Sequence, residues 1–188
     1  MAGRARPHII NMNGGGGFGP NNNYGGSGIN VCCCTCCTCI HFRFLKTTPG
    51  VMKIVEILLA SFCQSVLLEY GMEYSGTIGA SYFGFLTTAS SCMMTATILL
   101  GCYIVSEKSY NLIRQSLFET AFNAVAAITY FSASSYLAFA VKTFLLHLNV
   151  MRHQAYPAMS LVYGLGTVLG ILHAFDAYQS YRFFMGYR

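Results

Sequence analysis

The chain has 188 residues, of which 54% are hydrophobic and only 9% are charged. Soluble globular domains carry about a quarter charged residues, so this composition, with a mean hydropathy of +0.49, excludes an ordinary soluble domain. The formal net charge is +5. The basic residues flank apolar segments instead of forming one continuous basic domain, which argues against nucleic acid as a partner.

Residues 1–45 are predicted to form a cytosolic tail. Their central part, residues 11–30, reads NMNGGGGFGPNNNYGGSGIN, and such a sequence cannot bury enough apolar surface to offset the entropy of ordering. We expect a disordered spacer, with partner binding as the alternative. The first thirty residues contain no apolar run of the kind found in a cleavable secretory signal, so the N-terminus is expected to stay in the cytosol.

A cysteine cluster follows in the stretch VCCCTCCTCI, residues 31–40. Disulfides are disfavoured in the reducing cytosol. Zinc binding is the stronger alternative, because three pairs have C-x₂-C spacing, but no second ligand pair lies outside the apolar segments. Acylation of cysteines beside a membrane helix fits best. The S-acylation candidates are Cys32, Cys33, Cys34, Cys36, Cys37 and Cys39.

Four apolar segments predict transmembrane helices at residues 51–70, 78–105, 117–141 and 158–178. A helix needs about 20 mostly apolar residues to cross the hydrocarbon core, and continuous apolar runs favour helices over barrel strands. The short connections predict that consecutive helices pack as antiparallel neighbours. The expected fold is therefore an all-α membrane protein, a four-transmembrane-helix antiparallel bundle with a disordered N-terminal tail.

Basic residues predict the orientation of this bundle, because loops rich in Lys and Arg stay cytoplasmic. Nine of them fall on one side and two, Lys142 and Arg152, on the other. Both termini are therefore expected in the cytosol, with anionic lipid of the inner leaflet as a partner. The nine are Arg4, Arg6, Arg43, Lys46, Lys53, Lys108, Arg114, Arg182 and Arg188.

Small residues at four-residue spacing are candidates for helix packing, because they allow close approach of helices in lipid. One set is Gly166, Gly170 and Ala174; another begins with Ala80 and Gly84 and continues through Thr88, Cys92 and Ala96. Each step of four residues drifts by about 40°, so the longer set wraps around its helix and the shorter one makes the better contact face. Packing within the bundle is favoured, with self-association as the alternative.

Ionisable residues within or beside the apolar segments are few and costly. They are expected to form an interfacial charge belt on the cytoplasmic side, with a proton or ion path as the alternative. Lys53 and Glu56 are an i, i+3 pair, and Asp176 needs a cationic partner such as Arg182 or protonated His173. The belt residues are Lys53, Glu56, Arg114, Glu119, Asp176 and Arg182.

Apart from the zinc alternative for the cysteine cluster, the sequence offers no support for an enzyme, a cofactor or a metal centre. The glycine run at residues 14–17 lacks the Lys-Ser/Thr that follows in a phosphate-binding loop. Cys63, Cys92 and Cys102 lie within apolar segments, where cysteine behaves as a small apolar residue.

Two stretches resemble MARVEL-domain proteins, a family of four-helix membrane proteins. They are FLKTTPGVMKIVEILLASFCQSVLLEYG, residues 44–71, with its Lys53 and Glu56, and HAFDAYQSYR, residues 173–182. The resemblance covers residues 44–184 and implies a MARVEL-like domain at 46–184, with residues 179–188 as a short cytosolic C-terminus.

The MARVEL resemblance implies a non-enzymatic protein of the plasma membrane or vesicles that organises membrane for vesicle trafficking, apposition or fusion. The glycine-rich tail, the cysteine cluster and the FLKT entry at residues 44–47 resemble, more narrowly, a small member of that family implicated in myoblast fusion in muscle development. The alternatives are a structural component of an epithelial junction and, with less support, a channel or transporter. Homo-oligomers or other membrane proteins are the expected protein partners.

Overall fold

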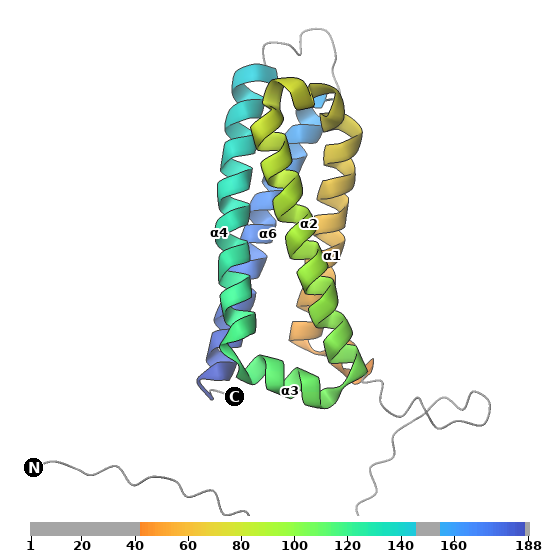
Figure 1. Ribbon diagram of the computed structural model, residues 1–188, viewed down its shortest axis with the longest axis vertical. Coiled ribbons are helices and arrows are strands. Elements are labelled where there is room, and N and C mark those ends of the chain that lie inside the picture. The colour runs from red at the N-terminus through yellow and green to blue at the C-terminus, as the bar shows by residue number, and fades with distance from the viewer. Residues whose placement is uncertain (1–41, 146–154, 187–188) are drawn as a thin grey trace, which may run out of the picture. The chain divides into compact units, whose positions relative to one another are not determined.

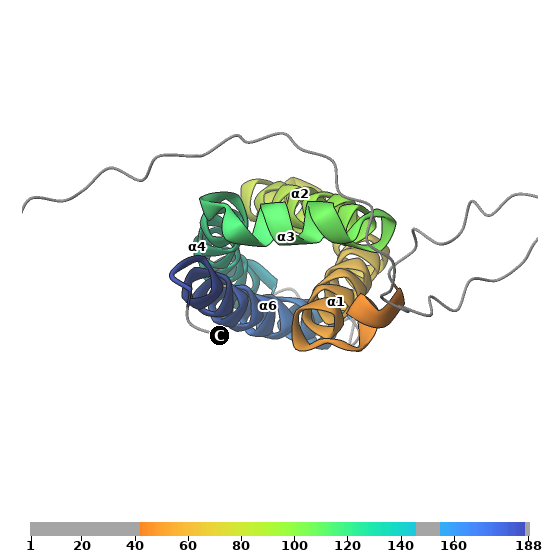
Figure 2. The ribbon, with the colours of Figure 1, turned by 90° about the horizontal axis from the view of Figure 1, so that it is seen from below.

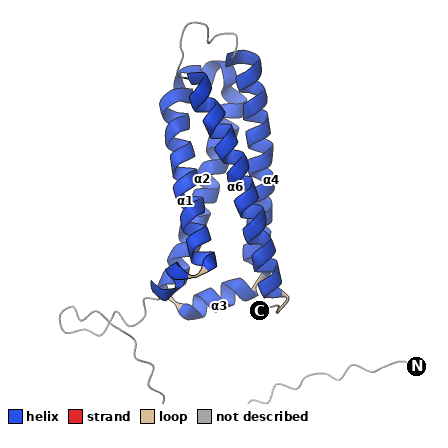
Figure 3. Cartoon of the chain, turned by 180° about the vertical axis from the view of Figure 1, so that it is seen from behind, coloured by secondary structure: helices blue, strands red, loops and turns tan. Residues whose placement is uncertain are grey.

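The computed structural model describes residues 42–145 and 155–186, which belong to one compact unit, Cys39–Arg188. Every regular element in these two ranges is a helix, and four of the helices are 24 residues or longer. Figure 3 shows the described part as helices joined by short turns. The all-helical class expected from the sequence is therefore confirmed for this part of the chain.

The entry to the bundle is a short 3-10 helix, η1 (Phe42–Lys46), followed directly by α1 (Thr48–Gly71). The Thr47 hydroxyl donates to the carbonyl of Phe44 at 2.6 Å, and a proline stands at the start of α1, where its missing N–H costs nothing. A Cβ at Gly50 would collide with the same Phe44 carbonyl. The glycine therefore allows η1 to fold back against the first turn of α1.

The chain then reverses through η2 (Met72–Tyr74) into α2 (Ser75–Val105). Ile78 has non-helical angles, φ −106° and ψ 17°, so the regular part of α2 begins at about the residue expected from the sequence. The next connection, for which the sequence predicts no helix, contains a nine-residue helix, α3 (Glu107–Gln115). The side chain of Ser106 caps α3 by accepting from the Ser109 N–H at 3.4 Å.

The second half consists of α4 (Leu117–Ala140), the π-helical turn η3 (Val141–Leu145) and α6 (Ala155–Phe184). Figure 1 shows α1, α2, α4 and α6 side by side, with α3 lying across one end between α2 and α4. Seen end-on, the four long helices form a ring in the order α1, α2, α4, α6 (Figure 2). Consecutive helices are therefore neighbours, as the short connections predict.

Three segments of the described chain are long and apolar enough to cross a membrane: Thr48–Val105, Leu117–Leu145 and Ala155–Phe184. The first has 58 residues and contains α1, η2 and α2. The outer surface of the helices carries many large apolar side chains, including Leu58, Met94 and Ile128, each more than 60% exposed. Such a surface is costly in water and matches a hydrocarbon solvent.

Candidate functional site

The charged residues singled out from the sequence gather inside the bundle, near the end that α3 crosses. Lys53, Glu56, Glu119 and Asp176 are at most 1% exposed, and Arg114 is 4% exposed. Arg182 differs, because it is exposed and lies over the Tyr178 ring at 6.0 Å. Five of the six residues of the expected belt therefore face the interior. We call this set, together with Asn123 and His173, the buried charge cluster.

Lys53 is the centre of this cluster. Its Nζ lies 2.6 Å from Asp176 Oδ2 on α6 and 3.1 Å from Glu56 Oε2 on α1, and it donates to Asn123 Oδ1 on α4 at 2.9 Å. The expected i, i+3 pair of Lys53 with Glu56 is thus confirmed. Asp176 has the cationic partner that it is expected to need, but this partner is Lys53 and neither of the two candidates named from the sequence, Arg182 and protonated His173.

Asn123 and His173 complete the hydrogen-bond network. Asn123 Nδ2 donates to Asp176 Oδ2 at 2.9 Å, and its Oδ1 lies 3.0 Å from His173 Nδ1. Because an amide oxygen only accepts hydrogen bonds, Nδ1 of His173 carries a hydrogen. The imidazole is stacked on the Tyr130 ring at 5.5 Å, which fixes the plane of the ring.

A second charge pair lies nearer to the end of the bundle. Arg114 Nε of α3 stands 3.4 Å from Glu119 Oε2 in the first turn of α4, and Arg114 also donates to Ser180 Oγ of α6 at 3.5 Å. Burial alone would lower the pKa of Arg114, but Glu119 and Tyr110 outweigh burial and raise it above its ordinary value. The guanidinium is therefore charged at physiological pH and ties α3 to α4 and α6.

Sequence reasoning missed that Asn123 and His173 join Lys53, Glu56 and Asp176 in one network. A signal for it exists: Asn123 follows Glu119 by four residues, and Asp176 follows His173 by three. Residues at these spacings share a helix face. The rest of these two helices is apolar. The polar residues on one face of each helix therefore predict that the two faces contact each other.

The small-residue sets divide between the interior and the outer surface. A Cβ at Gly166 would lie 2.5 Å from the Phe85 ring and would collide with Ser134 Oγ, and one at Gly170 would lie 3.0 Å from the Phe131 ring. These two glycines are therefore used within the bundle. Ala174, Ala80 and Gly84 are exposed, and a Cβ at Gly84 would meet nothing within 4 Å.

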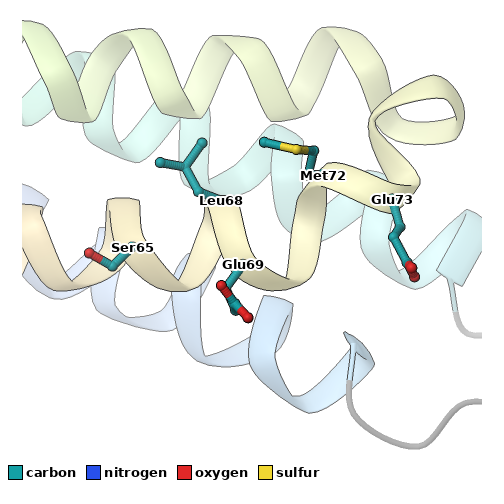
Figure 4. Close-up of a pocket in the computed structure, with 5 residues that line it drawn as sticks. All are labelled: Ser65, Leu68, Glu69, Met72 and Glu73. Carbon is teal, nitrogen blue, oxygen red and sulfur yellow. The ribbon is translucent and has the colours of Figure 1, made fainter.

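Away from this cluster, a shallow hollow lies on α1 near η2 at the opposite end of the bundle. It is lined by Ser65, Leu68, Glu69, Met72 and Glu73, as Figure 4 shows. Among the described residues, no group of three or more His, Cys, Asp and Glu side chains is arranged to hold a metal ion. The six clustered cysteines, residues 32–39, lie outside the described residues.

The helix cysteines are packed as small side chains. Cys63 and Cys92 are buried, and Cys102 is partly exposed. All three are free thiols. These positions within long helices agree with the interpretation of the three cysteines as small apolar packing residues.

Comparison with known proteins shows that the chain is similar in sequence to a protein of the fruit fly. It is 47% identical over 152 residues to the protein singles bar of Drosophila melanogaster, and the matched region covers 80% of this chain and 86% of the relative. No family profile matches the chain, and no solved structure matches it. Identity of this size over most of both chains indicates common ancestry.

Proposed function

Because the chain belongs to the singles bar family, we propose that it is a non-enzymatic, multi-pass membrane protein that organises membranes for vesicle trafficking, apposition or fusion. The observation that carries this proposal is the apolar outer surface of long helices, Thr48–Val105, Leu117–Leu145 and Ala155–Phe184. The polar groups that could perform chemistry point into the closed interior instead of lining a cleft. A substrate in water has no access to them in this arrangement.

In this proposal α1, α2, α4 and α6 each cross the bilayer, as in the MARVEL architecture that the sequence resembles. Each is at least 24 residues long, which exceeds the roughly 20 needed. The exposed basic residues Lys46, Lys108 and Arg182 belong to η1, to α3 and to the end of α6, at the end of the bundle that α3 crosses. The other end carries the acidic Glu69 and Glu73, in the last turn of α1 and in η2, and the exposed Lys142 of η3. This asymmetry supports cytosolic termini and contact of the α3 end with anionic lipid.

The small residues exposed on α2 support a further part of the proposal, self-association. Ala80 and Gly84 lie on the outer surface and are not used for packing inside the bundle. Small residues allow close approach of helices in lipid. We therefore place the contact for a second copy on α2 and not on the Gly166 and Gly170 face of α6.

The sharper form of the proposal is a role in the fusion of muscle precursor cells. It rests on the narrower resemblance of the glycine-rich tail, the cysteine cluster and the FLKT entry. Removal of the protein from myoblasts should leave cells that adhere but do not fuse, with vesicles stalled at their contacts. The measurement is the number of nuclei per cell, with re-expression of the wild-type chain as the control for specificity.

The outcomes of this experiment separate the candidate functions. Restored fusion on re-expression supports the sharper form, whereas normal fusion in the absence of the protein contradicts it. Stalled vesicles with normal fusion would keep the trafficking role alone. A leaking epithelial barrier, with the protein concentrated at lateral contacts, would favour the junction alternative instead.

A further inference from the structure

We infer that the buried charge cluster is a proton-binding site, which holds one exchangeable proton on Glu56 or on the neighbouring His173. The inference concerns the binding of a proton by the bundle itself and is independent of the proposed role in membrane organisation. It is carried by the formal charges of the buried side chains and by the contacts around two of them.

The first observation is a charge imbalance. Among the buried side chains that the structure describes, Lys53 and Arg114 carry two positive formal charges, whereas Glu56, Glu119 and Asp176 carry three negative ones. With a neutral imidazole the interior therefore holds one excess negative charge. An unbalanced charge in a low-dielectric interior is far more costly than a neutralised one. One bound proton removes the imbalance.

The contacts around Glu56 show where this proton fits. Lys53 occupies Oε2 of Glu56, but Oε1 is buried and makes no hydrogen bond in the described structure. His173 Nδ1 lies 3.4 Å from this oxygen. Because Nδ1 of His173 already carries a hydrogen, the added proton sits either on the Glu56 carboxyl or on Nε2 of the imidazole. In the second form the imidazolium faces the Glu56 carboxylate through Nδ1, and both forms neutralise the interior. The two forms contain the same number of protons and differ only in which of the two residues carries the added one.

The other buried carboxylates each face a cation, although Asp176 Oδ1 and both oxygens of Glu119 also make no hydrogen bond in the described structure. From α6, Asp176 is held by Lys53 and Asn123. Arg114 of α3 faces Glu119 of α4, which also faces the uncharged Tyr103 of α2. Around the pair itself lie the uncharged Tyr130 of α4 and the neutral thiols of Cys63 on α1 and Cys92 on α2. With Lys53 assigned to Asp176, its nearer carboxylate, and Arg114 to Glu119, Glu56 is the carboxylate without a cation of its own, and His173 is the titratable group beside it. Loss of the added proton leaves Glu56 and Asp176 sharing one lysine, which weakens the contact of α1 with α6.

The test is the pH dependence of unfolding of the full chain in detergent micelles from about pH 7 to about pH 8, above the ordinary pKa of histidine and below that of cysteine. If the folded protein binds one proton more than the unfolded chain, stability falls as pH rises, and the unfolding equilibrium constant increases up to about tenfold per pH unit. Glu56→Gln removes the excess negative charge, so this dependence should disappear. The control is Glu69→Gln, which removes an exposed carboxylate of the same helix and should keep the wild-type profile.

A Glu56→Gln profile as steep as that of the wild type would overturn the inference. If this variant does not fold, infrared spectroscopy of the wild-type protein decides the question. A band of a protonated carboxyl or an imidazolium that persists at about pH 8, and is unchanged in Glu69→Gln, supports the site. Spectra without such a band at this pH contradict it.

Discussion

At the scale of single residues, Lys53 is the cation shared by two buried carboxylates of the cluster. It contacts Glu56, Asn123 and Asp176 on three helices while its ammonium group is buried. Removing one partner of a buried ion pair costs more than the pair itself contributes, because the remaining charges stay buried without compensation. Lys53 is therefore the residue whose loss should be most harmful.

Lys53→Met tests this argument. We expect it to lower the free energy of unfolding by about 3–5 kcal/mol, because Glu56 and Asp176 lose their shared cation. The measurement is unfolding of the purified protein in mixed micelles. Lys46→Met is the matched control, since Lys46 is exposed, and it should change stability by no more than about 0.5 kcal/mol.

Equal stability of the two lysine variants would contradict the central role of Lys53. The triple variant Lys53→Met, Glu56→Gln, Asp176→Asn adds a second check. It removes the two carboxylates that Lys53 neutralises, so it should recover part of the loss seen in the single variant.

At the scale of elements, the contacts between neighbouring helices depend on which glycines face the interior of the bundle. α6 packs against α4 and α2 at Gly166, where Ser134 and Phe85 leave no room for a Cβ. The longer small-residue set on α2 runs from exposed Ala80 and Gly84 to buried Cys92 and Ala96, as the drift of about 40° per step requires. Equal spacing therefore does not give the two sets equal roles.

Gly166→Leu should destabilise the bundle by about 1–3 kcal/mol or more, because overpacking forces neighbouring side chains and backbone to shift. The control is Gly84→Leu on the outer face of α2, where a Cβ meets nothing within 4 Å. Its unfolding should match that of the wild-type chain in micelles. A larger loss in Gly84→Leu than in Gly166→Leu would show that the faces of these helices are the reverse of those described.

At the scale of the whole molecule, the bundle and the N-terminal tail are expected to attach to the membrane in different ways. The helices carry apolar surfaces, whereas the tail offers the six cysteines of residues 32–39. One acyl chain gives marginal membrane binding, and two signals give stable anchoring. Acylation would therefore hold the cysteine segment at the membrane beside the first helix.

Thioester acyl exchange on the expressed protein tests this proposal. The wild-type protein should exchange, and a variant with serine at all six cysteines of residues 32–39 should not. The control variant has serine at Cys63 and Cys102 within the helices and should exchange like the wild type. Absence of exchange in the wild-type protein would contradict acylation and make cysteine-bound zinc the next hypothesis to measure.

The sequence by itself determined the helical membrane class, because long apolar runs have few ways to satisfy their backbone hydrogen bonds in lipid. It also determined the Lys53 and Glu56 pair, since these residues are one helical turn apart. The sequence does not predict the helix α3, because the connection in which it lies is short and polar.

Only the tertiary structure decided which side of each helix faces inward. In a soluble bundle the apolar stripe marks the inner face, but in these helices both faces are apolar, so only the few polar positions indicate the inner face and the partner of each position is left open. This is why the structure was needed to bring Asn123 and His173 to Lys53, to join Asp176 to Lys53 instead of Arg182, and to separate inward Gly166 from outward Gly84. Each of these contacts joins residues far apart in the chain, and their meeting depends on helix rotation, which the packing of the whole ring sets.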